Sequence, residues 1–292
     1  MNLLHIRHIT TYEYRSPVEL GEHRLMARPR DSHDLRLLDT AMVIAPRARQ
    51  VRWIHDVFGN SIAIASFDTS AQRLTFTSDF HAEHYPADPQ AIEIEPYASS
   101  FPFSYSASDA EDLGRTKERH YADPTHRLDD WARSLLHKTD KANTLDTLSM
   151  MTSAIKSTFI YKARDAEGAQ TPLETLERGS GSCRDFALFM MEAARSLGLA
   201  ARFVSGYLYD AEKVESGEKM VGGGSTHAWL QIYLPGAGWV EYDPTNALIG
   251  GRNLIRVAVT RDPAQAAPLA GSFKGEKDAF ASMSVKVEIT TE

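Results

Sequence analysis

The residues with the clearest chemical potential surround the single cysteine of the chain, Cys183. It follows a Gly/Ser-rich stretch and precedes apolar residues spaced three to four positions apart, which predicts a helix. Ser182 and Asp185 match a capping box, so Cys183 is the expected first helical residue. The free N–H groups of that turn favour a thiolate and can donate to a developing oxyanion. This setting favours a nucleophile over a buried core cysteine.

A histidine and an aspartate downstream could activate this thiol. His227 begins one strand-like segment, and Asp243 ends the next one after a Pro/Gly turn. If the hairpin loop has an odd length, or one bulge, both side chains lie on one face. His227 would then lie near Thr245. Asp243 would lie near Trp229 and could fix the imidazole tautomer, which predicts a Cys183–His227–Asp243 triad.

Further residues could assist this chemistry. Gln170 could donate a second hydrogen bond to the oxyanion. Trp229 and Trp239 could shield the imidazole from water, although packing within the sheet explains them equally well. A charged segment before the predicted strand could form a substrate flap or an inert hairpin tip, and its conformational freedom comes from three glycines, Gly222, Gly223 and Gly224.

The elements that position these residues fall into two regions. Residues 1–95 contain short alternating strand-like runs between turn residues, which predicts an N-terminal β-sandwich domain. Residues 96–124 lose this period and are expected to be a connector. Residues 125–292 mix helical and strand patterns and form the predicted catalytic domain. The expected fold is α+β, with the nucleophile at the N-terminus of a helix packed on an antiparallel sheet.

Composition and charge restrict the function. The 292 residues carry a net charge of −7, which argues against nucleic acid and anionic membranes as partners. The sequence shows neither a long apolar run nor a signal-peptide pattern, so we expect a cytoplasmic protein. One cysteine cannot build a multi-thiolate zinc site, and no Gly-rich phosphate loop follows a predicted strand. We therefore expect neither a metal nor a cofactor.

Three motifs resemble those of the transglutaminase-like superfamily of papain-related cysteine enzymes, in its bacterial branch with an N-terminal β-domain. They are GSCRDFA, AARFVSGYLY and THAWLQIYLPGAGWVEYDPTN. The core resemblance spans about residues 145–247 and places Cys183, His227 and Asp243 at the three catalytic positions of the family. It implies a papain-like fold and acyl transfer on an amide through a thioester acyl-enzyme.

The predicted activity is hydrolysis of a peptide or protein amide by a cysteine protease or amidase. The sequence contains no sign of a dedicated tunnel for an amine acceptor, which favours water as the acceptor. Two alternatives remain open: a transglutaminase that crosslinks proteins at glutamine, and a non-catalytic binding scaffold with the same fold.

Overall fold

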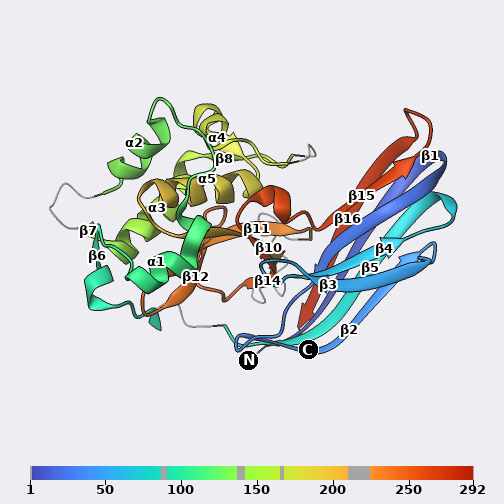
Figure 1. The fold of residues 1–292 in the computed structure, drawn as a ribbon, viewed down its shortest axis with the longest axis horizontal. Helices are drawn as coiled ribbons and strands as arrows, with labels where there is room; N and C mark the ends of the chain where they lie inside the picture. The colour runs from blue at the N-terminus through green and yellow to red at the C-terminus, as the bar shows by residue number, and fades with distance from the viewer. Residues whose placement is uncertain (1, 87–90, 137–141, 165–167, 210–223, 292) are drawn as a thin grey trace.

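The computed structural model describes residues 2–86, 91–136, 142–164, 168–209 and 224–291. Figure 1 shows two parts, a curled β-sheet and an α+β part in which helices lie on the side of a second sheet that faces away from the curled one. The predicted α+β class is thus confirmed. In the described residues, no helix is both long and apolar enough to cross a membrane.

The curled sheet consists of long antiparallel segments around one central strand. Its strands are β1 (Asn2–Arg28), β2 (Leu35–Ala45), β3 (Gln50–His55), β4 (Ser61–Ser66), β5 (Ser70–His84), β15 (Leu269–Lys274) and β16 (Phe280–Thr291). One side of β1 pairs with β5 and β4, and the other side pairs with β16 and β15. Strands β2 and β3 continue the sheet beyond β5 and β4. The strands thus form one hydrogen-bonded sheet that curls, where the sequence predicted a sandwich.

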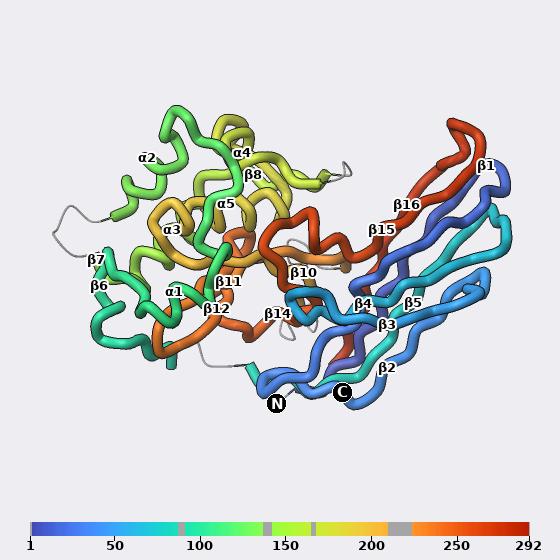
Figure 2. Tube along the Cα trace, in the orientation of Figure 1, coloured from blue at the N-terminus to red at the C-terminus, as the bar shows by residue number. Residues whose placement is uncertain are grey.

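The structure also corrects the predicted C-terminal boundary. The last two strands, which the sequence assigned to a catalytic domain of residues 125–292, pair with most of β1 between Leu4 and Leu25 (Figure 2). Strand β16 contributes Val287 to the apolar cluster that contains Leu4 and Ile6 of β1. The alternating pattern of β16 indicated a strand correctly, but a period of two does not reveal the pairing partner.

The α+β part is built on a five-stranded antiparallel sheet in the order β13-β12-β11-β10-β14. Its strands are β10 (Ala201–Leu208), β11 (His227–Leu234), β12 (Gly238–Asp243), β13 (Leu248–Ile249) and β14 (Leu254–Thr260). The α-helices are α1 (Ala107–Leu113), α2 (Arg127–Ser134), α3 (Thr144–Thr158), α4 (Pro172–Arg178) and α5 (Cys183–Ser196). Helix α5 packs on β11 and β10 and is surrounded by α2, α3 and α4.

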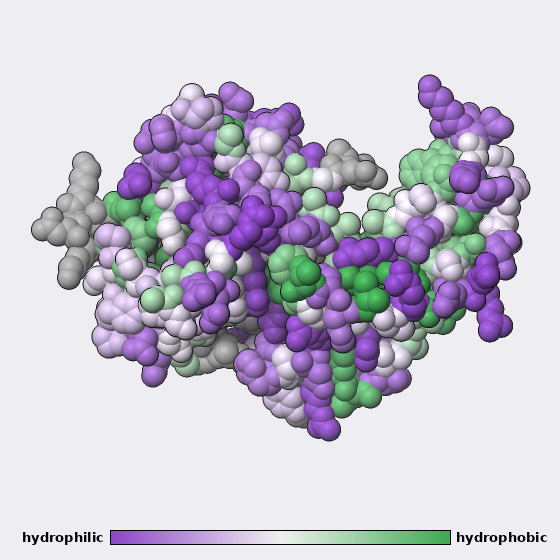
Figure 3. Space-filling view, in the orientation of Figure 1, coloured by the Kyte–Doolittle hydropathy of each residue, from purple (hydrophilic) through white to green (hydrophobic). Residues whose placement is uncertain are grey.

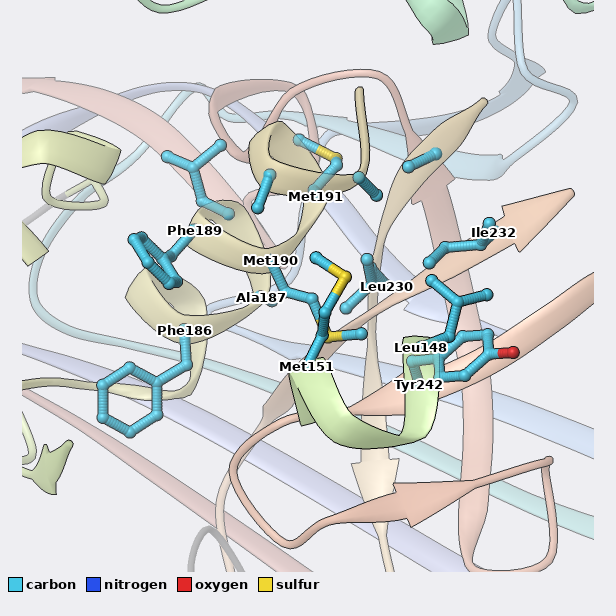
Figure 4. Close-up of a cluster of buried hydrophobic side chains, with 14 of the residues drawn as sticks. Leu148, Met151, Phe186, Ala187, Phe189, Met190, Met191, Leu230, Ile232 and Tyr242 are labelled. Carbon is cyan, nitrogen blue, oxygen red and sulfur yellow. The ribbon is translucent and has the colours of Figure 1, made fainter. Parts of the chain in front are cut away.

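The core of this part lies between α5 and one face of the sheet (Figure 4). Ala187 and Met190 of α5 belong to one cluster with Leu230 of β11, whereas the ring of Phe186 lies against Phe159 on the other side of the helix. The predicted apolar stripe of this helix is buried at Phe186, Met190, Ala193 and Ala194 and partly buried at its last residue, Leu197. Several neighbouring residues are buried too, because other helices cover the far side of α5. Two of its charged residues, Glu192 and Arg195, are buried and form an ion pair with each other at 2.8 Å, which offsets the cost of burying them.

The predicted connector, residues 96–124, packs against this core. It contains the 3₁₀ helices η2 (Pro96–Ala98) and η3 (Gly114–Lys117), strand β6 (Ser100–Phe101) and α1. Phe101 is buried in the core cluster. The remaining short elements are β7 (Ala142–Asn143), which pairs with β6, β8 (Ile160–Tyr161), β9 (Ser180–Gly181) and the 3₁₀ helix η4 (Pro263–Gln265).

The two parts share an apolar interface. Leu4, Ile6 and Phe80 of the curled sheet form one cluster with residues of β10 and β14, namely Tyr207, Ile255 and Val257. Asn60 adds a specific polar contact, because its side chain both donates to and accepts from the backbone of Val259, at 2.7 and 2.9 Å. The curled sheet is therefore docked on β10 and β14.

Phe80→Ala should reduce the free energy of unfolding by about 3–5 kcal/mol, because it leaves a cavity in this interface. Phe80 is 1% exposed. The matched control is Phe273→Ala on β15, where the ring is 37% exposed, and its cost should stay below about 1 kcal/mol. Urea unfolding of both variants measures the difference. Equal costs would contradict a packed interface.

Candidate active site

Cys183 occupies the predicted position at the first residue of α5. Ser182 is the N-cap, and the Asp185 carboxylate accepts hydrogen bonds from its backbone N–H at 2.7 Å and its hydroxyl at 2.9 Å. The predicted N-cap is thus confirmed. Cys183 itself is 8% exposed and lies at the border of the core cluster, so the thiol is less open to solvent than its Gly/Ser-rich approach suggested.

The β11–β12 hairpin has the register that the sequence predicted. Leu234 pairs with Gly238 across a three-residue loop, and Leu230 pairs with Tyr242. This odd-length loop puts His227 and Asp243 on the same face of the sheet. His227 Nε2 lies 2.8 Å from Asp243 Oδ2, and both side chains are buried.

The surroundings of Asp243 keep its carboxylate charged. The carboxylate also accepts hydrogen bonds from the backbone N–H of Thr245 and the side-chain amide of Asn246, both at 2.9 Å. Burial alone would raise the pKa of Asp243, but the charge on His227 and these hydrogen bonds lower it. A buried anion is thereby held against the imidazole.

The imidazole of His227 is correspondingly biased toward its charged form. Burial by itself lowers the pKa of His227, but the Asp243 carboxylate and then Cys183 outweigh it and raise this pKa to about 10. The second ring nitrogen, Nδ1, is buried and has no nitrogen or oxygen partner in the described residues. Since Nε2 is held by Asp243, Nδ1 is the nitrogen left to exchange a proton with the thiol.

Asp185 is the centre of a second buried network, beneath the nucleophile. Besides Ser182, it accepts hydrogen bonds from Arg164 at 3.0 and 3.1 Å and from the backbone N–H of Gln170 at 2.6 Å. The side-chain amide of Gln170 donates to Asp185 at 3.0 Å and to the Ser180 carbonyl at 3.3 Å. Both amide hydrogens are thus engaged, which corrects the predicted oxyanion role. Gln170 instead helps to fix the start of α5.

The two tryptophans predicted to shield the imidazole have different surroundings. Trp229 is fully buried and stacks on His227, with ring centres 6.0 Å apart and an interplanar angle of 25°. Trp239 instead contacts Tyr233, and its ring centre lies 4.1 Å from the guanidinium carbon of Arg202. The geometry therefore agrees with shielding by Trp229, whereas Trp239 packs elsewhere on the sheet.

The indole of Trp229 is hydrogen-bonded to a network of charged residues that the sequence did not predict. Its N–H donates to Glu241, which also accepts from Arg256 at 2.7 Å. Arg256 in turn binds the Asp34 carboxylate at 3.0 Å through both oxygens. Asp34 precedes β2, so this chain of contacts connects the curled sheet with the ring that covers His227. The position of Glu241 in the strand hinted at an inward-facing acid, but nothing in the sequence indicated its partners.

The predicted flap falls mostly outside the described residues. Gly222 and Gly223 are not described, and Gly224 accepts a hydrogen bond through its carbonyl from the backbone N–H of Val287 in β16 at 2.9 Å. Within the described part of the chain, no group of three or more His, Cys, Asp or Glu side chains could hold a metal ion.

A cysteine at a helix N-terminus beside a buried His–Asp pair on an antiparallel sheet is the arrangement of a papain-related, transglutaminase-like fold. Residues 129–244 match the transglutaminase-like superfamily, and residues 4–83 match the bacterial transglutaminase-like N-terminal region. The chain belongs to the transglutaminase-like superfamily, in the form that carries this bacterial N-terminal region.

Similar proteins include an uncharacterized protein of Mycobacterium tuberculosis, 27% identical over 275 residues that cover 91% of this chain and 86% of the relative. An uncharacterized protein of Mycobacterium leprae is 37% identical over 118 residues, 40% of each chain. A crystal structure titled as a "putative cysteine protease" from Cytophaga hutchinsonii superposes with a TM-score of 0.71, covering 99% of this chain and 90% of that chain at 18% identity. At this identity the superposition shows a shared fold.

Asp243→Asn should lower the pKa of His227 well below about 10, because an amide lacks the negative charge that contributes most to raising it. In the wild type, stabilisation by the charged ring is complete below about pH 6.5 and is lost as the pH rises through about 10. NMR titration of ring-labelled histidine measures the shift. Asp79→Asn, beside the half-buried His5, should leave His227 unchanged. Titration of His227 near pH 6.5 in the wild type would contradict the charged pair.

Glu241→Ala should destabilise the fold by about 3 kcal/mol, because it removes one of the two carboxylates that pair with Arg256 and leaves the buried indole N–H of Trp229 without its acceptor. Glu177→Ala is the matched control, since Glu177 pairs with Arg127 at the exposed surface. Its cost should stay below about 1 kcal/mol. Urea unfolding compares the two variants, and a loss in Glu241→Ala as small as that of the control would refute the network's structural role.

Proposed function

We propose that this protein is a cysteine hydrolase that cleaves an amide bond of a peptide or protein by acyl transfer. Cys183 is the proposed nucleophile, His227 the general base and acid, and Asp243 the residue that orients the imidazole. The main support is the buried His227–Asp243 pair at the N-terminus of α5, with one imidazole nitrogen left for the thiol. Family membership supports this class of chemistry independently.

In the first half-reaction, His227 Nδ1 holds the proton given up by Cys183, as the raised pKa of His227 favours, and the sulfur attacks the carbonyl carbon of the amide. The carbonyl π electrons move onto oxygen, and the backbone N–H of Cys183 can donate to that oxyanion because the first turn of a helix leaves its amides free. When the C–N bond breaks, the imidazolium gives its proton to the departing amine. The product is a thioester on Cys183.

In the second half-reaction, water replaces the amine. His227 removes a proton from the water, the hydroxide attacks the thioester carbon, and the C–S bond breaks. The sulfur leaves as a thiolate, and the carboxylic acid formed from the substrate departs. Asp243 stays charged throughout and compensates the positive ring in both steps. Trp229 covers one face of the imidazole and limits access of water to it.

The experiment compares the wild type with Cys183→Ala on a mixture of unlabelled peptides analysed by mass spectrometry in ¹⁸O-water. The wild type should produce shorter peptides with one ¹⁸O in each new carboxyl group, and Cys183→Ala should lose at least about a thousandfold in rate. An equal melting temperature of the two proteins excludes unfolding as the cause. Transfer to an added primary amine without ¹⁸O incorporation would instead indicate crosslinking. No turnover, and no labelling of Cys183 by a thiol-directed electrophile, would indicate a binding scaffold.

A further inference from the structure

A groove on the curled sheet lies apart from the candidate active site. Its volume is about 640 Å³, and its lining comes from β2, β3, the bend between them, β5 and the end of β1. The lining includes three arginines, Arg28, Arg47 and Arg49, and the apolar residues Val51 and Trp53. Cavities of this size suit a ligand rather than a few waters.

All charged residues that line the groove are positive. Arg28, Arg47 and Arg49 are the charged residues of its lining, and none of them forms an ion pair with a carboxylate in the described part of the chain. The protein as a whole carries a net charge of −7. Three arginines without counter-charges are therefore a local reversal of the overall charge, and they attract an anionic ligand.

Apolar surface accompanies these arginines. Trp53 is 46% exposed and Val51 is 40% exposed, and the guanidinium of Arg28 lies 5.8 Å from the centre of the Trp53 ring. Figure 3 shows hydrophobic patches among hydrophilic ones on the curled sheet. An exposed tryptophan beside cations suits a ligand that combines carboxylates with apolar side chains.

The backbone around the groove favours an extended ligand. Strands β2 and β3 form one border of the sheet, since β2 pairs with β5 and β3 with β4, and no other described strand pairs with either. Their outward N–H and C=O groups are thus available to a further strand. A free sugar or a phosphate would use the arginines but not this border.

We propose that the groove binds an extended, acidic polypeptide segment. Its carboxylates pair with Arg28, Arg47 and Arg49, its apolar side chains cover Trp53 and Val51, and its backbone adds to the β2–β3 border. The assignment of this segment to a substrate of the thiol site rests on the proposed function. The binding itself does not depend on that function.

The test measures fluorescence anisotropy of a labelled peptide of alternating Glu and Thr with full-length Cys183→Ala protein, so that turnover plays no part. The peptide should bind, more weakly as salt is added, and its Gln/Thr counterpart should bind at least about tenfold more weakly. Arg47→Glu with Arg49→Glu should weaken binding at least about tenfold. The matched control is Arg52→Glu, an exposed arginine of β3 outside the groove, which should change the affinity less than about twofold.

Equal affinity for the Glu and Gln peptides, or equal loss in the groove and control variants, would overturn the proposal. Stronger binding of a sulfated polysaccharide than of the acidic peptide would overturn the polypeptide assignment. Self-association of the protein that Arg47→Glu and Arg49→Glu abolish would assign the groove to a second copy. Binding without any hydrolysis by the wild type would uphold the groove while the proposed function fails, so the two failures are distinguishable.

Discussion

The contact on which this site depends is the buried hydrogen bond between His227 Nε2 and Asp243 Oδ2. A charged pair of this kind is costly to bury and persists only where other groups satisfy it. Thr245 and Asn246 supply these groups at the end of β12. The pair therefore requires the odd hairpin loop, the burial of β11 and β12, and the position of α5, which brings Cys183 to the open nitrogen.

The curled sheet helps to position the ring of His227, although its strands are far from His227 in the sequence. Arg256 forms ion pairs with Asp34 and with Glu241. Glu241 in turn accepts a hydrogen bond from the indole of Trp229, which covers His227. Docking of the curled sheet on β10 and β14 keeps these partners together. The two parts of the molecule thus act as one support for the imidazole. The arginine groove lies on the curled sheet, and Phe80 of the docking interface also lines it.

Much of the candidate site could be predicted because its signals are local. The capping pattern of Ser182 and Asp185 sets the start of α5, and the parity of the hairpin places His227 and Asp243 on one face. Gln170 was assigned wrongly, because its distance along the chain from Cys183 says nothing about which acceptors surround its amide. Its true partners, Asp185 and Ser180, are determined by how α4 and α5 pack.

The sequence alone determined the α+β class, the helix that begins at Cys183, the strands that carry His227 and Asp243, and the family, because helix caps, periodicity and short motifs are properties of neighbouring residues. Tertiary structure alone decided that β15 and β16 join β1, that Glu241 reaches Asp34 through Arg256, and that Cys183 is nearly buried. Each of these results is a contact between segments far apart in the chain, and such contacts are selected by the shape and charge of the whole molecule.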